Sequence, residues 1–285
     1  MPRVAIGRHV LGYDEFGSAD GTAVLLVHGH PFARGMWRPQ AEALAAAGYR
    51  VIAPDLRGYG ESPLGDDTDG ADGADGAEAG IVLQSDFAAD LTELLDRLGV
   101  RQAVVGGVSM GGQIAMALHA EHPERVLALV LSDTSAPPET PDGREFRNRM
   151  ADRLLAEGMA GYAEEVIDKM IAPYNVDAQP RLAERIRRMM RETDPRAAAA
   201  ALRGRAERPD YRPTLSAAAV PALVLVGADD VYTPLPQAEE LAGLLPDAEL
   251  AVIPDAGHLP GAEQPAEFNR RLLAFLLARV PPTSA

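Results

Sequence analysis

The sequence predicts an α/β fold with a mostly parallel central sheet flanked by helices. Short apolar runs of strand length recur along the chain, helical patterns separate them, and proline or glycine stops several of the runs. Continuous apolar runs are typical of strands buried on both faces, as in a parallel sheet. Their regular alternation with helical segments favours a doubly wound or related α/β sheet. At 285 residues the chain is long enough to bury a large core.

The predicted elements follow one another through most of the chain. The first strand ends at His28-Gly29-His30-Pro31, which cannot continue a strand, and Pro54 stops the second. The strands are expected at 23–27, 51–53, 104–108, 126–131, 223–226 and 250–253. The helical patterns lie at 37–47, 85–98, 111–121, 236–245 and 265–277.

Residues 65–80 interrupt this rhythm with six acidic residues and no large apolar one. Asp67, Asp69 and Glu78 match three positions of an EF-hand calcium loop. The match fails because the fifth position is Ala71 and the glycine position is Asp72. We therefore expect a solvated surface loop.

A second interruption, residues 136–217, opens with Pro137-Pro138 and contains no convincing strand. Its helical patterns lie at 143–157, 162–171, 181–191 and 195–206. The segment predicts a helical insertion after the strand at 126–131, the sixth strand of the complete predicted fold, which divides the chain into 1–135, 136–217 and 218–285. Five methionines lie within the insertion: Met150, Met159, Met170, Met189 and Met190. They either line an apolar pocket or only seal the insertion against the core.

Composition excludes several function classes. The net charge of −15 argues against nucleic-acid or anionic-membrane partners, because binding to either needs a basic face. The chain has no cysteine, which excludes disulfides, thiolate metal sites and a cysteine nucleophile. No apolar run approaches the ~20 residues of a membrane span, and the N-terminus lacks the apolar core of a signal peptide. These features predict a cytoplasmic protein and leave its oligomeric state open.

The strongest chemical signal is Gly107-Val108-Ser109-Met110-Gly111, placed where a predicted strand ends and a helix begins. This placement is typical of a nucleophile elbow, a sharp turn that projects a serine hydroxyl from the sheet edge. Gly107 and Gly111 supply the small residues that the crossing of strand and helix requires. We therefore predict that Ser109 is a nucleophile rather than a structural serine.

A serine nucleophile needs a base, and the base needs an acid to orient its ring. His258 follows the last predicted strand in a loop at the same sheet edge, so it is the candidate base. Asp229 and Asp230 follow the strand at 223–226, and Asp133 follows the strand at 126–131. Chain order and placement alone do not separate Asp229 from Asp230.

Acyl transfer also needs backbone N–H donors for the oxygen that becomes negatively charged. The N–H of Met110, directly after the nucleophile, is one expected donor. The other is expected in the loop after the first predicted strand, at the backbone of His30. Whether the His30 imidazole also faces the site stays open, and His28 is expected to have a structural role in that loop.

The chain resembles α/β-hydrolase fold proteins of the esterase, enol-lactonase and cofactor-free haloperoxidase branch. The resemblance covers nearly the whole chain, in the segments VHGHPF, APDLRGYGES, GVSMGGQIAM, PERVLALVLSDT, VPALVLVGADDVYTP and IPDAGHLPGAEQPAEFN. It implies that Asp230 is the acid, with Asp133 as a fallback, and that His30 and Met110 supply the oxyanion donors. It also implies that residues 136–217 are a cap over the site. The family has a different residue type more often at His30, and the acidic loop has no counterpart there.

These features together predict a serine hydrolase that cleaves a small-molecule carboxylic ester or lactone through an acyl-enzyme on Ser109, with no metal or organic cofactor. A serine at this position argues against the haloalkane dehalogenase and epoxide hydrolase reactions, which need a carboxylate nucleophile. The same residues could serve thioester hydrolysis, acyl transfer, carbon–carbon bond hydrolysis or perhydrolysis. A ligand-binding protein with a silent triad is the alternative outside enzymes. The substrate itself is not predicted.

Overall fold

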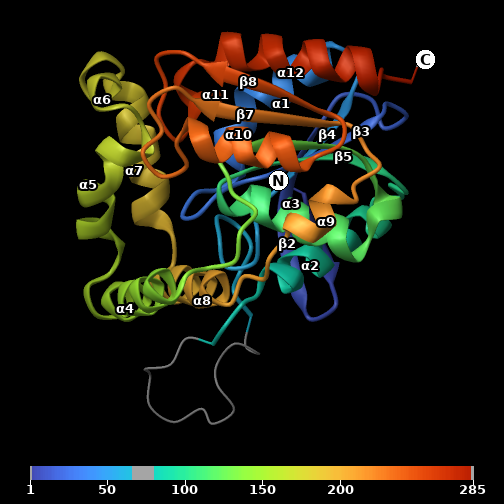
Figure 1. The fold of residues 1–285 in the computed structure, drawn as a ribbon. Helices are drawn as coiled ribbons and strands as arrows, with labels where there is room; N and C mark the ends of the chain where they lie inside the picture. The colour runs from blue at the N-terminus through green and yellow to red at the C-terminus, as the bar shows by residue number, and fades with distance from the viewer. Residues whose placement is uncertain (1, 66–79, 284–285) are drawn as a thin grey trace.

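A computed structural model describes residues 2–65 and 80–283, so nearly all of the acidic loop predicted at 65–80 lies outside the described residues. The centre of the molecule is an eight-stranded sheet in the order β1-β2-β4-β3-β5-β6-β7-β8 (Figure 1). The strands are β1 (Arg3–Ile6), β2 (His9–Phe16), β3 (Ala23–Val27), β4 (Arg50–Pro54), β5 (Ala103–Val108), β6 (Val126–Ser132), β7 (Ala222–Gly227) and β8 (Ala248–Ile253). The strands from β4 through β3 to β8 pair in parallel, which confirms the predicted fold class.

The N-terminal strands β1 and β2 pair antiparallel with each other, and β2 pairs antiparallel with β4. They were not predicted. The sequence of β2 contains Gly12, Asp14 and Glu15, so it lacks the continuous apolar run by which the other strands were recognised. Two half-exposed strands at a sheet edge do not need such a run.

Alternating residues of the central strands face two separate cores. Leu25 of β3 packs into one cluster, whereas its neighbours Val24 and Leu26 pack into the other. One core includes α2 (Gln84–Arg97), α3 (Met110–Glu121), α9 (Arg212–Ser216) and α10 (Leu235–Leu244). The other includes α1 (Arg38–Ala46) and α12 (Pro265–Arg279), which lie on the opposite face. Short helices η1 (Arg34–Trp37), η3 (Pro123–Arg125) and α11 (Pro260–Glu263) complete the connections.

Of the six helices between β6 and β7, the first five lie together beyond one side of the sheet (Figure 1). They are α4 (Pro141–Glu157), α5 (Met159–Met170), α6 (Pro173–Ala178), α7 (Pro180–Glu192) and α8 (Pro195–Ala206). Helices α4 and α8 pack closely on each other around a small apolar cluster of their own. The next helix, α9, contacts α3 and α10 of the main body instead.

The parallel strands end at a common edge, which positions the candidate site. Val27 pairs with Gly107, Gly107 with Leu131, and Gly227 with Ile253. The segments that follow these strands therefore converge at the carboxyl edge of the sheet, where ligands bind in open α/β sheets. In the described part of the chain, no helix is both long and apolar enough to cross a bilayer.

Candidate active site

Ser109 lies on a strained turn between β5 and α3. Its backbone has φ 55° and ψ −118°, a conformation that costs an L-residue about 1–3 kcal/mol. The Ser109 N–H donates to the carbonyl of Ser132, and Thr134 Oγ1 donates to the Ser109 carbonyl at 2.8 Å. These bonds from β6 and its following loop hold the turn, so the sheet maintains the strained position of the serine.

The glycines around Ser109 allow strand and helix to cross. A Cβ on Gly107 would lie 2.2 Å from the carbonyl of Gly111, and a Cβ on Gly111 would lie 2.2 Å from the Val27 oxygen. Both distances are far shorter than any side-chain contact. The requirement for small residues, predicted from the spacing alone, therefore has a direct steric cause.

The loop after β3 lies against the same turn. A Cβ on Gly29 would come 3.0 Å from the Val108 oxygen and 3.4 Å from the Ser109 Cβ. His30, the next residue, is buried and lies on the wall of the same cavity as Ser109. Met110 is the first residue of α3, so its N–H has no partner within the helix. Backbone from the loop after β3 and from the start of α3 therefore lies beside Ser109, as an oxyanion site requires.

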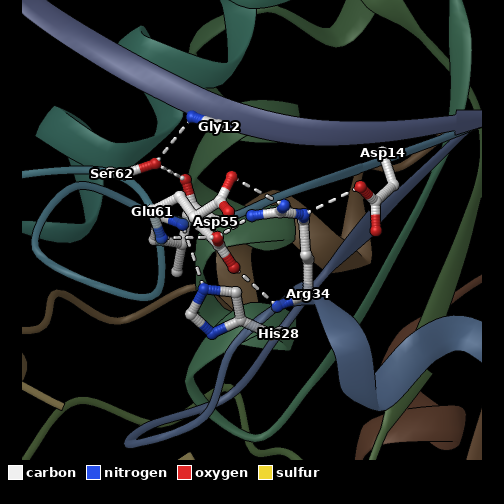
Figure 2. A network of polar contacts seen from close by, with 8 residues as sticks. Gly12, Asp14, His28, Arg34, Asp55, Glu61 and Ser62 are labelled. Atoms are coloured by element: carbon white, nitrogen blue, oxygen red, sulfur yellow. Dashed lines mark hydrogen bonds and ion pairs between the residues drawn. The ribbon is translucent and has the colours of Figure 1, made fainter. Parts of the chain in front are cut away.

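A buried ion-pair network stands behind this loop. Figure 2 shows the Asp55 carboxylate between the side chain of Arg34 and neighbouring backbone. Asp55 accepts hydrogen bonds from the Arg34 N–H at 2.8 Å, from the Arg34 guanidinium and from the Glu61 N–H at 2.9 Å. The guanidinium also pairs with Glu61 at 3.0 Å and with Asp14 of β2 at 3.1 Å. The network ties β2, the end of β4 and η1 together around the residues that follow β3.

The two histidines of the loop have different environments. Leu56 N–H donates to His28 Nε2 at 3.0 Å, so His28 Nδ1 carries the proton and donates to the Gly29 carbonyl at 2.9 Å. Burial lowers the pKa of His28, and its structural role in the loop is confirmed. His30 Nδ1 lies 2.8 Å from the Tyr59 hydroxyl, while its Nε2 is buried without a hydrogen-bond partner. His30 lines the same cavity as Ser109, and its imidazole packs against Tyr59.

His258 and Asp230 form a close buried pair. His258 Nδ1 lies 2.9 Å from Asp230 Oδ2, and both side chains are almost fully buried. Asp230 also accepts hydrogen bonds from the Tyr232 N–H at 2.8 Å and from the Thr233 hydroxyl. Burial alone would raise the pKa of Asp230, but the His258 charge and these hydrogen bonds lower it to about 2. Asp230 is therefore ionised at neutral pH.

The other two carboxylates considered from the sequence differ from Asp230. Asp229 is exposed and accepts a hydrogen bond from the Tyr174 hydroxyl at 2.5 Å. Asp133 is buried beside the pair, and one polar atom each of Asp133, Asp230 and His258 lie within 4.8 Å of one another. Burial and the negative charge of Asp230 raise the pKa of Asp133 well above its usual value, although Ser132 and the Gly227 N–H donate to it.

Asp133, Asp230 and His258 are also the one group with metal-ligand spacing in the described ranges. Their donor atoms are already engaged with one another and with neighbouring residues. A cation there would have to displace these hydrogen bonds. The three residues therefore fit a hydrogen-bonded His–Asp pair beside a second acid better than they fit a cation site.

A buried glutamate, not noticed in the sequence, links the inserted helices to the loop of His258. Glu263 of α11 accepts hydrogen bonds from the Gly257 N–H, the Ala172 N–H and the Asn175 side chain, at 2.7–2.8 Å. Gly257 directly precedes His258, and Ala172 and Asn175 lie at the start of α6. Glu263 lies within the segment IPDAGHLPGAEQPAEFN, but nothing in that segment indicated that its carboxylate is buried.

Ser109 and His258 open onto one cavity of about 580 Å³, within the range of small-molecule sites. Its wall comes from the carboxyl edge of the sheet and from α4, α5 and α8. Only Met150 and Met170 of the five methionines line it. Met159 and Met190 are buried in apolar clusters, and Met189 is packed against one. The expected methionine pocket is thus only partly present, because three methionines seal the insertion instead.

Comparisons with known proteins identify the family of the chain. The family model described as "alpha/beta hydrolase fold" matches residues 22–265. A thermophilic esterase from Thermogutta terrifontis, solved with malate bound, is 37% identical, covers 98% of this chain and 99% of its own, and superimposes with a TM-score of 0.89. The enol-lactonase of Burkholderia xenovorans LB400 is 27% identical over 96% of this chain and 99% of its own, with a TM-score of 0.84. The protein named "Putative carbamate hydrolase RutD" from Variovorax paradoxus is 34% identical over 95% of this chain and 97% of its own. The resemblance seen in the sequence motifs is confirmed, and the chain belongs to the α/β-hydrolase fold family.

Proposed function

We propose that the chain is a serine hydrolase that cleaves a carboxylic ester or a lactone through an acyl-enzyme on Ser109. The observation that carries this proposal is the single cavity onto which Ser109, on its strained turn, and the buried His258–Asp230 pair both open. The esterase and enol-lactonase relatives support the same reaction class.

In the proposed mechanism, Ser109 Oγ attacks the carbonyl carbon while its proton passes to His258. Because His258 Nδ1 faces Asp230, Nε2 is the nitrogen left to accept this proton. The tetrahedral intermediate collapses when the bond from carbon to the leaving oxygen breaks, and His258 returns the proton to that oxygen. Water, deprotonated by His258, then attacks the acyl-enzyme, and the acid leaves as Ser109 recovers its proton.

The backbone N–H groups of Met110 and His30 are the proposed oxyanion donors. Gly29 packs directly against the Ser109 turn, which brings the loop of His30 beside the first residue of α3. Donors held in place by the sheet and by the Asp55 network need not reorganise during the reaction, and each one contributes ~10²–10³ in rate.

We also propose that residues 136–217 act as a cap over this site, with 1–135 and 218–285 forming the hydrolase core. Helices α4, α5 and α8 contribute to the cavity wall opposite the sheet edge. Glu263 joins the start of α6 to the loop of His258 by hydrogen bonds, so the packing of the inserted helices and the position of the base depend on each other.

Labelling with a fluorophosphonate tests the proposal directly. An activated Ser109 forms a bond to phosphorus, fluoride leaves, and intact-protein mass shows one adduct that peptide mapping places on Ser109. Ser109→Ala should remove the adduct. Ser135→Ala is a matched control, because Ser135 lines the same cavity without a turn of this kind, and it should keep the adduct.

Unlabelled wild type and Ser109→Ala would then be assayed with matched esters, lactones and thioesters. Hydrolysis of esters or lactones with loss of activity in Ser109→Ala supports the proposal. A folded native chain that forms no adduct and turns over none of these compounds contradicts it and favours the ligand-binding alternative.

A further inference from the structure

Three arginines of the inserted helices form a cluster on the cavity wall, which we call the cap arginine cluster. Arg147 belongs to α4, Arg205 to α8, and Arg208 lies just after α8. All three line the cavity onto which Ser109 and His258 open. A concentration of positive charge is unexpected here, because the chain as a whole carries a net charge of −15.

The cluster has few negative partners. Glu139 accepts a hydrogen bond from Arg147. Neither Arg205 nor Arg208 makes an ion pair with a carboxylate in residues 2–65 and 80–283, and the Nε atom of each is buried with no hydrogen-bond partner. The acidic residues nearest to them in sequence do not compensate, since Glu207 pairs with Arg144 and Asp210 with Arg212.

Three guanidinium charges therefore share the Glu139 carboxylate in a poorly solvated place, and Arg205 and Arg208 interact with it without a direct hydrogen bond. Burial, and then the charges of Arg147 and Arg208, lower the pKa of Arg205 well below its ordinary value. Arginine nevertheless stays protonated in proteins. A buried charge without a partner is costly, and an anion that makes hydrogen bonds to it offsets that cost. The cluster is therefore suited to bind an anionic group of a ligand.

The cluster lies near the reacting end of the cavity. The charges of Arg205 and Arg147 contribute to the lowered pKa of His30, after the larger effect of burial. His30 belongs to the proposed oxyanion loop, and its unpartnered Nε2 lies in the same region. The cavity wall is apolar in part, with Met150, Val166 and Leu202 among its residues.

We infer that the substrate is an ester or lactone that also carries a carboxylate, and that Arg205 and Arg208 bind this carboxylate while the carbonyl faces Ser109. The inference rests on the proposed function and adds the substrate class to it. The planar guanidinium matches a carboxylate in a two-point hydrogen bond, which orients the substrate as well as binding it.

A matched pair of substrates tests this. The 4-nitrophenyl monoester of glutaric acid carries a free carboxylate, and its methyl ester is neutral and of similar shape. We expect the wild type to have a higher kcat/KM for the anionic ester. Arg205→Gln should lower kcat/KM for the anionic ester about tenfold to hundredfold, the loss typical of a charge-assisted hydrogen bond. The neutral ester should change by less than about threefold, within the usual error of such comparisons.

Three further variants make the result specific. Arg208→Gln should act in the same direction as Arg205→Gln, and Arg205→Lys, which keeps the charge, should recover part of the lost activity. Arg203→Gln is the matched control on the same helix, because Arg203 pairs with Asp152 and does not line the cavity. It should change neither rate, and circular dichroism would show that each variant is folded.

The outcomes separate this inference from the proposed function. If Ser109 is labelled and the neutral ester is hydrolysed, but the wild type does not favour the anionic ester or Arg205→Gln lowers both rates equally, the inference is wrong and the proposed function stands. If Ser109 is not labelled, calorimetric titration with glutarate still tests the site, since Arg205→Gln should abolish binding. Binding of inorganic phosphate without glutarate would overturn the choice of a carboxylate.

Discussion

The identity of the acid that supports His258 can be decided by replacing two buried carboxyls separately. Asp230 and Asp133 both lie beside His258, and Asn is close in size to Asp. The pKa of Asp230 falls from 3.8 to about 2, which at about 1.36 kcal/mol for each pKa unit corresponds to roughly 2 kcal/mol of stability at neutral pH. Asp133 has the opposite environment, because burial and the charge of Asp230 raise its pKa well above the usual value.

We therefore expect Asp230→Asn to lower kcat by ~10³–10⁴, as expected when the group that orients and charges the catalytic imidazole is lost. Asp133→Asn should keep kcat within about threefold, because the hydrogen bonds of Asp133 come from Ser132 and the Gly227 N–H, whereas Asp230 pairs with His258. The folded-state pKa of Asp230 is depressed, so its stabilisation is present above about pH 4 and is lost as the pH falls through about 2.

The assay is steady-state hydrolysis of an activated ester by both variants, together with urea unfolding at pH 7 and at pH 3. Asp230→Asn should unfold more easily than wild type at pH 7, with a smaller difference at pH 3. The reasoning would be refuted if Asp133→Asn lost as much activity as Asp230→Asn, since Asp133 would then be the working acid.

Three other predictions follow from the same structure. The raised pKa of Asp133 means that its contribution to stability is fully present below about pH 4 and is lost as the pH rises through its folded value. Asp133→Asn should therefore flatten the decline of unfolding free energy with pH, and an unchanged profile would count against a raised pKa of Asp133. Gly111→Ala should abolish fluorophosphonate labelling and destabilise the fold by about 1–3 kcal/mol, because the new Cβ would lie 2.2 Å from the Val27 oxygen. Full labelling of this variant would contradict the close crossing of strand and helix. Asp55→Asn should lower the unfolding free energy by roughly 3 kcal/mol and reduce kcat, because the guanidinium of Arg34 would lose its most buried partner. A change in unfolding free energy below about 0.5 kcal/mol, as for an exposed pair, would show that the network does not support the loop after β3.

The parts of the site that sequence predicts well are those fixed by the backbone. Gly107 and Gly111 flank Ser109 because the strand and the helix touch there, so their spacing and the position of the turn follow from one steric rule. The parallel strands were found for a similar reason, since burial on both faces demands continuous apolar runs. Strand β2 was not predicted, because it lies half exposed and contains charged residues.

Which of two neighbouring side chains faces the site depends on how the elements pack, so it could not be predicted from position in the sequence. Asp229 and Asp230 both follow β7, and spacing alone gives each the same claim. In the fold Asp230 points inward to His258, while Asp229 is exposed and contacts Tyr174 of α6. The resemblance to the family implied Asp230, and in the structure that residue lies against His258, the proposed base. Local sequence could not separate the two residues, because it does not record how β7 and the loop of His258 face each other.

The arginines of the cavity were missed for a related reason, which lies in the composition of α8. Successive residues of a helix are about 100° apart, so Arg203 and Arg205 point roughly 200° away from each other. One pairs with Asp152 of α4 and the other lines the cavity. A helix with a clear apolar stripe would reveal which of the two faces inward. In α8 the preceding residues 197–201 are all alanine and all buried, because the helix packs on α4 and on the main body at once. A sequence that is small and apolar on every side carries no preferred face, so the direction of Arg205, and with it the charge of the cavity, exists only once the inserted helices are packed.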